Sequence, residues 1–233
     1  MSGSKFILNN QLLSSLSDSA FQRLSPYLEE ISLTAGQVVH QSYKTITDVY
    51  FPQTAVFSLI VTMSDKSTAE ISLVGKEGMV GLPAIFGDDL PDTDTVVQIP
   101  GKALKLPTKV IRNEFLQDGE LRSLLLIYAR AYIAQISQIA ACSSLHNIEQ
   151  KLARTLLLIH DYTQQQTLQL TQKSLSLMLG VRRASITEAA ISLQKQQILQ
   201  YSRGKIKILN RSSLLAIACE CYSKIDSEYK RLL

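Results

Sequence analysis

The sequence is poor in the residues that build disulfide frameworks, metal sites and membrane spans. Its three cysteines, Cys142, Cys219 and Cys221, provide neither a disulfide framework nor a four-ligand zinc site. No uninterrupted apolar run reaches about 18 residues, the length of a membrane-spanning helix. Residues 1–10 contain one lysine and no sustained apolar stretch, so we expect no signal peptide. These absences predict a cytoplasmic protein with no membrane partner.

The motifs of the common enzyme classes are also absent. The chain has no nucleophile elbow, no Walker loop, no His-Glu-x-x-His pattern and no convincing pair of carboxylates for acid–base catalysis. We therefore predict that the protein is not an enzyme and that none of its residues is catalytic.

What the chain does have is an ordinary globular composition with unevenly distributed charge. Its 233 residues are 45% hydrophobic and 19% charged, which argues against disorder and suits one or two domains. The net charge of +4 is the sum of two halves of opposite sign. Residues 1–118 carry 9 basic and 13 acidic residues, a net −4, whereas residues 119–233 carry 15 basic and 7 acidic residues, a net +8. Residues 171–211 alone contain eight basic residues and one acidic residue. This concentration indicates a polyanion partner, with a solvated basic face as the simpler alternative.

Hydrophobic spacing predicts a helical N-terminus followed by a β-rich region. Apolar residues recur at helical spacing over residues 10–30, with Ser17 as an internal cap. From Ile31 the period changes to two. Short β-rich runs separated by turn residues then follow at 37–40, 48–51, 55–62, 69–74, 96–99 and 103–106. Many short strands without intervening long helices predict an antiparallel sandwich or barrel.

One long helix is predicted between residues 120 and 147, where proline and glycine are absent. Two apolar stripes run along it and need two partners, which we take to be the barrel and a second copy of the same helix. A buried helix in a monomer is the alternative. One stripe has the 4-3 spacing of a coiled-coil seam and is the predicted homodimer interface: Leu121, Leu125, Tyr128, Tyr132, Gln135, Ile139 and Cys142. The second stripe comprises Leu126, Ala129, Ile133, Ile136 and Ala140.

The basic segment has the pattern of a helix-turn-helix. Thr171 is a predicted N-cap for a short helix reaching residue 178, and Gly180 stands where a left-handed C-cap would end it. Counted from Gln172, the ninth position is this glycine and the fifth is the small Ser176, where two helices must approach closely. A second helix is predicted over residues 182–196. A generic pair of helices needs neither the small residue nor this charge pattern.

The second helix of this unit would be a recognition helix, because its first residues are Arg-Arg-Ala-Ser-Ile-Thr. Arginine can read guanine, or it can contact phosphate without reading sequence. Residues 198–201 and 205–209 flank Ser-Arg-Gly and predict a basic β-hairpin wing for phosphate contacts. The predicted DNA-binding residues are Thr171, Gln172, Lys173, Arg182, Arg183, Ser185, Thr187, Arg203 and Lys205.

Together these features resemble the Crp–Fnr superfamily of bacterial transcription regulators. The resemblance is most specific over residues 170–210, at 76–81 in the barrel and at 218–222 near the C-terminus. It implies an α+β fold: an N-terminal antiparallel β-barrel of the cyclic-nucleotide-binding type, a long dimerisation helix and a C-terminal winged helix-turn-helix. The domains would span residues 1–118, 119–147 and 148–233. The implied partners are a second copy of the chain, palindromic sites in double-stranded DNA, RNA polymerase for an activator, and a small-molecule effector of unidentified nature.

The barrel departs from the pattern of family members that bind cyclic AMP. Those members use a Gly-Glu pair for the ribose and an Arg-Ser or Arg-Thr pair for the cyclic phosphate. Here Gly81 is followed by Leu82 and Pro83, and residues 92–95 read Asp-Thr-Asp-Thr where the arginine should fall. Because two aspartates repel an anion, we predict no tight binding of cyclic AMP or cyclic GMP.

The other sensory chemistries of the superfamily have little support in this sequence. No cysteine precedes Cys142, which argues against an iron–sulfur sensor. Cys219 and Cys221 stand two apart on an expected helix and would face different directions. They are interpreted as buried structural residues, with a redox role as the alternative. The only histidines are interpreted as structural or surface residues: His40, His146 and His160. We therefore predict no cofactor and no metal.

The leading interpretation is a sequence-specific, DNA-binding transcription regulator. The alternative is a ligand-binding or protein-interaction module whose winged helix no longer binds DNA.

Overall fold

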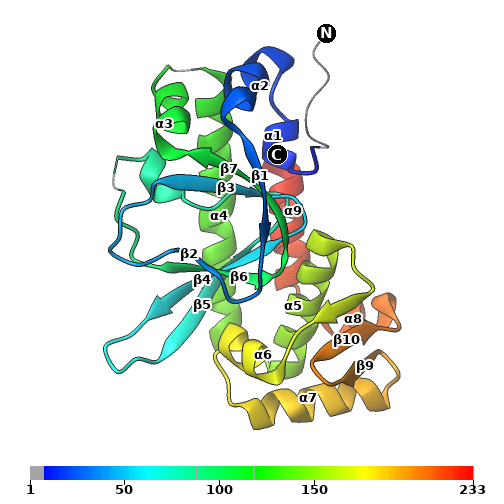
Figure 1. The fold of residues 1–233 in the computed structure, drawn as a ribbon. Helices are drawn as coiled ribbons and strands as arrows, with labels where there is room; N and C mark the ends of the chain where they lie inside the picture. Colours follow the sequence, from blue (N-terminus) through cyan, green and yellow to red (C-terminus); the bar gives the residue numbers. More distant parts are fainter. Residues whose placement is uncertain (1–7, 88, 118, 233) are drawn as a thin grey trace.

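A computed structural model of the chain describes residues 8–87, 89–117 and 119–232. Two groups of strands and helices are joined by one long helix, and the sheets within both groups are antiparallel (Figure 1). The predicted α+β class with a β-rich N-terminal part, a long helix and a C-terminal helix-turn-helix region is confirmed.

The N-terminal helical region is broken into short pieces. Helix α1 spans Gln11–Ser14, helix α2 spans Asp18–Leu24, and a 3-10 turn follows at Ser25–Tyr27. The predicted cap is present, because the Ser17 hydroxyl accepts a hydrogen bond from the backbone of Ala20. Strand β1 begins at Glu29, so the last residues of the predicted helix are extended instead.

The predicted strands form two antiparallel sheets. One sheet has the order β1-β7-β3 and the other has the order β2-β6-β4-β5. Burial alternates along β6, as expected for strands with one face on a core. The bounds are Glu29–Leu33 for β1, Val38–His40 for β2, Asp48–Pro52 for β3, Val56–Thr62 for β4, Thr68–Val74 for β5, Asp94–Ile99 for β6 and Gly101–Pro107 for β7.

Helix α3 spans Thr108–Leu116, and the long helix α4 spans Glu120–Leu145. One face of α4 packs against the barrel. The Tyr128 hydroxyl donates a 2.7 Å hydrogen bond to the carbonyl of Met79, and a side chain on Gly78 would collide with that tyrosine. Helix α4 is also the one described helix that is long and apolar enough to cross a membrane by length and composition alone.

The predicted dimer seam does not lie on the free face of α4. Five of its residues are buried within the chain, because they face the barrel and the C-terminal helix: Leu121, Leu125, Tyr128, Gln135 and Cys142. Tyr132 and Ile139 are half-buried against the same core. Of the second stripe, Leu126 (48%), Ile133 (64%) and Ala140 are exposed, whereas Ala129 is buried and Ile136 is half-buried. The stripe with 4-3 spacing therefore packs inside the chain and not against a second copy. Packing inside a protein selects nearly the same periodicity as a coiled coil.

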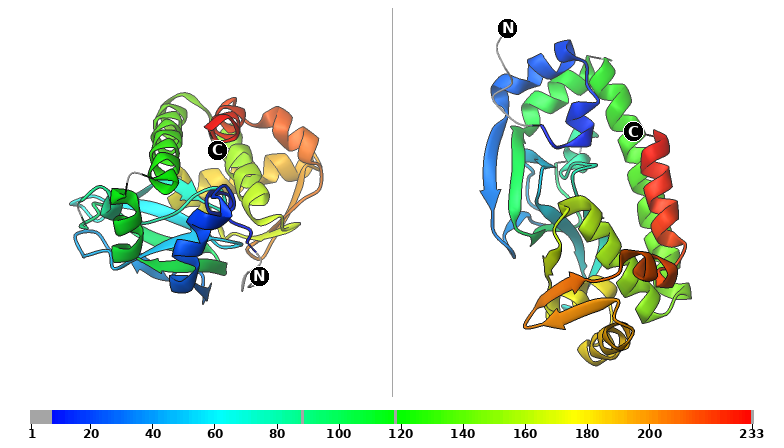
Figure 2. Two further views of the ribbon diagram at one scale, coloured as in Figure 1. Left: turned by 90° about the horizontal axis from the view of Figure 1, so that it is seen from above. Right: turned by 90° about the vertical axis from the view of Figure 1, so that its right-hand side faces the viewer.

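The C-terminal group begins directly after α4. Its order is helix α5, strand β8, helices α6 and α7, the hairpin β9–β10, and helices α8 and α9. Figure 2 shows α9 running alongside α4, so the end of the chain returns to the long helix. The bounds are Ile148–Thr163 for α5, Thr167–Gln169 for β8, Gln172–Leu179 for α6, Arg183–Lys195 for α7, Leu199–Ser202 for β9, Lys205–Ile208 for β10, Arg211–Ile217 for α8 and Cys221–Leu232 for α9.

Candidate nucleic-acid interface

Helices α6 and α7 form the two helices of the predicted helix-turn-helix. Thr171 caps α6, since its hydroxyl accepts a 3.0 Å hydrogen bond from the backbone of Ser174. Gly180 ends α6 at a φ of 62° and a ψ of 35°, a left-handed conformation that glycine adopts without a steric cost. The backbone of Val181 then donates to the carbonyl of Ser176 at 3.0 Å and closes the turn. Each of these local signals was readable from the sequence.

The core between the two helices fixes the direction of α7. Leu175 and Ile186 are fully buried, and Ser176 is 9% exposed at the close approach of the helices. The Ser176 hydroxyl donates to the carbonyl of Lys173 at 2.8 Å, so its polar group is satisfied within its own helix. The opposite face of α7 is left to solvent.

The exposed N-terminus of α7 carries two free cations. Arg182 is the N-cap residue and Arg183 the first helical residue, and both are exposed. Among the described residues neither forms an ion pair, and the first turn of α7 contains no acidic side chain. Because the backbone amides at a helix N-terminus are themselves electropositive, this end of α7 attracts anions. The half-buried Ser185 lies in the same turn, whereas the Thr187 hydroxyl donates to the Arg183 carbonyl at 3.0 Å.

The predicted wing is a three-stranded sheet with the order β8-β10-β9. Its hairpin turns at Arg203 and Gly204, both with positive φ, in the two-residue form that suits a twisted hairpin. On β10 the exposed Lys205 and Lys207 alternate with Ile206, which is fully buried. The wing thus presents a row of cations on one face.

Strand β8 was not predicted as a strand. It pairs with β10 in the register Leu168 opposite Ile206, and it completes the wing. Its signal is the alternation of residues 167–170, in which Leu168 and Leu170 are fully buried. A three-residue strand is too short for that alternation to stand out beside the neighbouring run of glutamines.

The start of α6 lies beside the wing, so four of the nine predicted DNA-binding residues lie close together: Thr171, Gln172, Arg203 and Lys205. Thr171, Gln172 and Arg203 line a shared groove of about 440 Å³. Lys173 is placed differently. Together with Thr171 it lines a crevice of about 360 Å³ against strands β4, β5 and β6 of the barrel.

The barrel holds a separate cavity of about 450 Å³ against α4. Gly81, Leu82 and Asp92 all line it, so the two segments singled out in the sequence do meet there. Most of its surface is apolar, and none of the described residues that line it is an arginine or lysine. Tyr132 and Ile136 of α4 form its wall, and the buried Tyr132 hydroxyl has no hydrogen-bond partner among the described residues.

Asp94 and His40 have structural roles around this cavity. Asp94 lies outside the lining, because its carboxylate accepts a 2.8 Å hydrogen bond from the backbone of Ser42. His40 contacts the carbonyl of Asp48 at 2.8 Å, and burial lowers the pKa of its imidazole. A neutral histidine cannot replace the missing guanidinium as a partner for phosphate.

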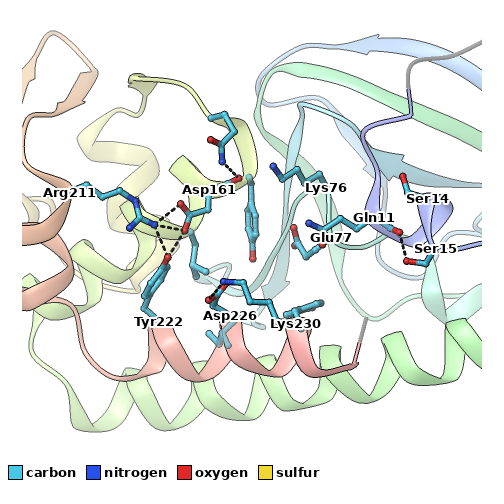
Figure 3. A pocket seen from close by; sticks show the side chains of 15 residues that line it. Gln11, Ser14, Ser15, Lys76, Glu77, Asp161, Arg211, Tyr222, Asp226 and Lys230 are labelled. Atoms are coloured by element: carbon cyan, nitrogen blue, oxygen red, sulfur yellow. Dashed lines mark hydrogen bonds and ion pairs between the residues drawn. The ribbon is translucent and has the colours of Figure 1, made fainter.

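A further cavity of about 620 Å³ lies between α1, α5 and α9 (Figure 3). Its charged groups are largely occupied with one another: Arg211 donates to Asp161 at 2.8 Å, and the Tyr222 hydroxyl donates to the same carboxylate at 2.6 Å. Burial raises the pKa of Glu77, which also lines this cavity, to about 7. Lys230 pairs with Asp226 at 2.7 Å, whereas Lys76 forms no ion pair among the described residues.

The cysteines do not lie as expected. Helix α8 ends at Ile217 and α9 begins at Cys221, so Cys219 lies between two helices and not on one. Cys219 and Cys221 therefore turn toward the same place, where Cys142 and His146 meet them. The expectation that they face different directions is wrong, because the rule of helical spacing does not apply at a helix junction.

Comparison with known proteins identifies the C-terminal region and the fold. Residues 150–217 match the Crp-like helix-turn-helix domain. No curated protein sequence matches the chain. Among the solved structures that share the fold are the following three. FixK2 from Bradyrhizobium japonicum is 14% identical, with a TM-score of 0.68 over 82% of this chain and 98% of that one. A CRP/FNR-family transcriptional regulator from Thermus thermophilus is 19% identical, with a TM-score of 0.67 and coverage of 82% and 98%. CLP, a c-di-GMP-responsive global regulator from Xanthomonas campestris, is 11% identical, with a TM-score of 0.67 and coverage of 82% and 99%.

The barrel cavity generates a prediction about ligands. Calorimetric titration of the purified protein with cyclic AMP or cyclic GMP is expected to show no binding, because the described residues that line the cavity offer a phosphate Asp92 and no cation. The variant Asp92→Asn is the matched control: removing the repulsive charge supplies no guanidinium, so it too is expected not to bind. A dissociation constant in the micromolar range for the unaltered protein would contradict this reading of the cavity.

Proposed function

Because residues 150–217 are a Crp-like helix-turn-helix domain, on a chain with the fold of Crp/Fnr transcriptional regulators, we propose that the protein is a sequence-specific, DNA-binding transcription regulator that acts as a homodimer. The observation that carries the proposal is that Arg182 and Arg183 form no ion pair among the described residues at the electropositive N-terminus of α7, together with the exposed lysines of the wing. The net charge of residues 171–211 supports a polyanion as the partner.

In the proposed complex, α7 enters the major groove with its N-terminal residues toward the base edges. Arg183 is the candidate for reading guanine, whose O6 and N7 accept two parallel hydrogen bonds from a guanidinium. Arg203 and Lys205 of the wing contact the phosphate backbone, and Lys207 on the same face adds a third cation. Thr171 and Gln172 line the groove beside the wing and are placed for backbone contacts.

The exposed face of α4 is the proposed dimer interface. Leu126, Ile133 and Ala140 recur every seven residues on it, which is the period of paired helices in a coiled coil. The exposed Ser137 and Ser144, four residues after Ile133 and Ala140, are small enough to allow two helix backbones to approach closely. Two chains paired in this way carry two recognition helices, which suits a palindromic site.

The barrel cavity is the proposed effector site, with a ligand other than a cyclic nucleotide. Its apolar lining suits a mostly apolar molecule. Since Tyr132 and Ile136 belong to α4, a ligand that favours one position of this helix shifts the balance between two dimer geometries. The protein is not proposed to catalyse any reaction, and its proposed location is the cytoplasm. RNA polymerase is a further partner if the protein activates transcription.

The DNA-binding proposal is tested with duplexes that the unaltered protein selects from a random-sequence library. In fluorescence anisotropy, Arg183→Ala is expected to weaken binding by about 1–3 kcal/mol and to relax the preference at one base pair of each half-site. Lys205→Ala is expected to weaken binding to all sequences alike and to lower the salt slope by about one.

Lys109→Ala is the control for these variants, because it removes an exposed cation from α3, away from the interface. It is expected to bind as the unaltered protein does. If the double variant Arg182→Ala/Arg183→Ala kept full affinity, the winged helix would not be the DNA-binding element. The proposal would then give way to a ligand-binding or protein-interaction module.

The dimer proposal predicts the effect of a charge on the exposed face of α4. Ile133→Glu is expected to convert a dimer of the 25.9 kDa chain to a monomer in sedimentation velocity, because pairing would bury an unpaired carboxylate. Leu116→Glu is the matched control, since Leu116 is 70% exposed on α3. Equal dissociation in both variants, or a monomeric unaltered protein, would contradict the proposed interface.

A further inference from the structure

All three cysteines of the chain meet one histidine at the junction between α4 and the C-terminal group. Cys142 lies in the last turn of α4, and His146 is the residue that ends this helix. Cys219 lies between α8 and α9, and Cys221 begins α9. The four ligand-type atoms all lie within 4.8 Å of one another, although the two pairs are more than 70 residues apart in the sequence.

Two of the distances between these atoms are close to those around a single tetrahedral ion. The Sγ atoms of Cys142 and Cys219 are 3.5 Å apart, and the Sγ of Cys221 is 3.5 Å from Nδ1 of His146. Zinc–sulfur and zinc–nitrogen bond lengths place ligand sulfurs about 3.8 Å apart, and a sulfur and a nitrogen about 3.6 Å apart. A polynuclear iron–sulfur cluster needs its thiolates more widely separated, because they bind different metal atoms.

The surroundings are those of a closed, structural site. Cys142 and Cys221 are fully buried, Cys219 is 4% exposed, and the His146 side chain is 16% exposed. Three cysteines and one histidine are a common ligand set of structural zinc sites, in which no position is left open for a substrate.

Contacts outside the four side chains orient them as a metal site requires. The Nε2 atom of His146, on the far side of the ring from Cys221, lies 3.1 Å from the carboxylate of Glu220. This is the carboxylate–histidine arrangement that fixes the tautomer of a metal-binding imidazole. The side-chain amide of Gln138 donates to the Sγ of Cys221 at 3.0 Å, which suits a thiolate.

A buried arginine supplies the charge that such a site needs. One divalent ion with three thiolates and a neutral imidazole has one net negative charge. Arg154 of α5 is 6% exposed, and its Nε and Nη1 atoms have no hydrogen-bond partner among the described residues. Its positive charge acts on Cys142 and Cys219, and also on the carboxyl group of Glu70 in the barrel. A cluster of uncharged cysteines would leave this guanidinium without compensation from that side.

We propose that the four side chains of this cluster bind one zinc ion. The ion joins the end of α4 to the start of α9. It lies at the link between α4 and α5, which connects the helix-turn-helix to the long helix. Its binding does not depend on the proposed function. If that function is correct, the ion also fixes the orientation of each recognition helix relative to the dimer helix.

The test is the metal content of the full-length protein, purified under reducing conditions and measured by inductively coupled plasma mass spectrometry. The expected result is one zinc per chain, and replacement by Co²⁺ is expected to give the absorption of tetrahedral cobalt–thiolate coordination. His146→Gln and Cys219→Ser are expected to lose the ion. His160→Gln is the matched control and is expected to keep it, because His160 lies outside the cluster.

Glu220→Gln keeps the test informative if the ligand variants fail to fold. It leaves all four ligands in place, and it is expected to weaken zinc binding by about 10–100-fold while full occupancy is still reached at high zinc. An unaltered protein that is folded but binds neither Zn²⁺ nor Co²⁺ would overturn the proposal. Iron with acid-labile sulfide, or a Cys142–Cys219 disulfide in the reduced preparation, would overturn it as well.

Discussion

The side-chain amide of Gln135, in the middle of α4, donates to the carbonyl of Leu73 in the barrel at 2.7 Å and accepts a 2.6 Å hydrogen bond from the Tyr229 hydroxyl of α9. The residue is 1% exposed, so all its hydrogen bonds must be made inside the protein. Through this amide, one face of α4 is bonded to both the barrel and α9. The opposite face, with Leu126 and Ile133, is left without a partner among the described residues. The proposed dimer follows from this division.

The same division connects sensing with DNA binding in the proposed regulator. The barrel cavity borders α4 near its middle, at Tyr132 and Ile136, and the cysteine cluster lies at its C-terminal end. Between those points α4 is continuous, so a change in its position at the cavity is carried to the link that precedes α5. The zinc site we propose stiffens that link. With a rigid link, the distance between the two recognition helices is set by how the two α4 helices pair.

The sequence predicted the features that local physics determines. The N-cap at Thr171, the left-handed Gly180 and the hairpin turn at Arg203 each depend on a few neighbouring residues, and the structure has all three. Which stripe of α4 faces the barrel was not predictable, because both stripes have helical spacing and only the tertiary packing distinguishes them. The cysteine cluster was missed for a related reason. Its sequence signals are a Cys-x3-His and a Cys-x-Cys pattern more than 70 residues apart, and only the return of α9 to α4 joins them.

The central claim is that two copies of α4 pair through their exposed faces and present two α7 helices to one duplex. Hydroxyl-radical footprinting on a duplex selected by the unaltered protein tests this claim most directly. The account predicts two equivalent protected regions, related by two-fold symmetry, with centres one turn of DNA apart or about 34 Å. A single protected half-site, or uniform protection without a symmetric centre, would contradict it.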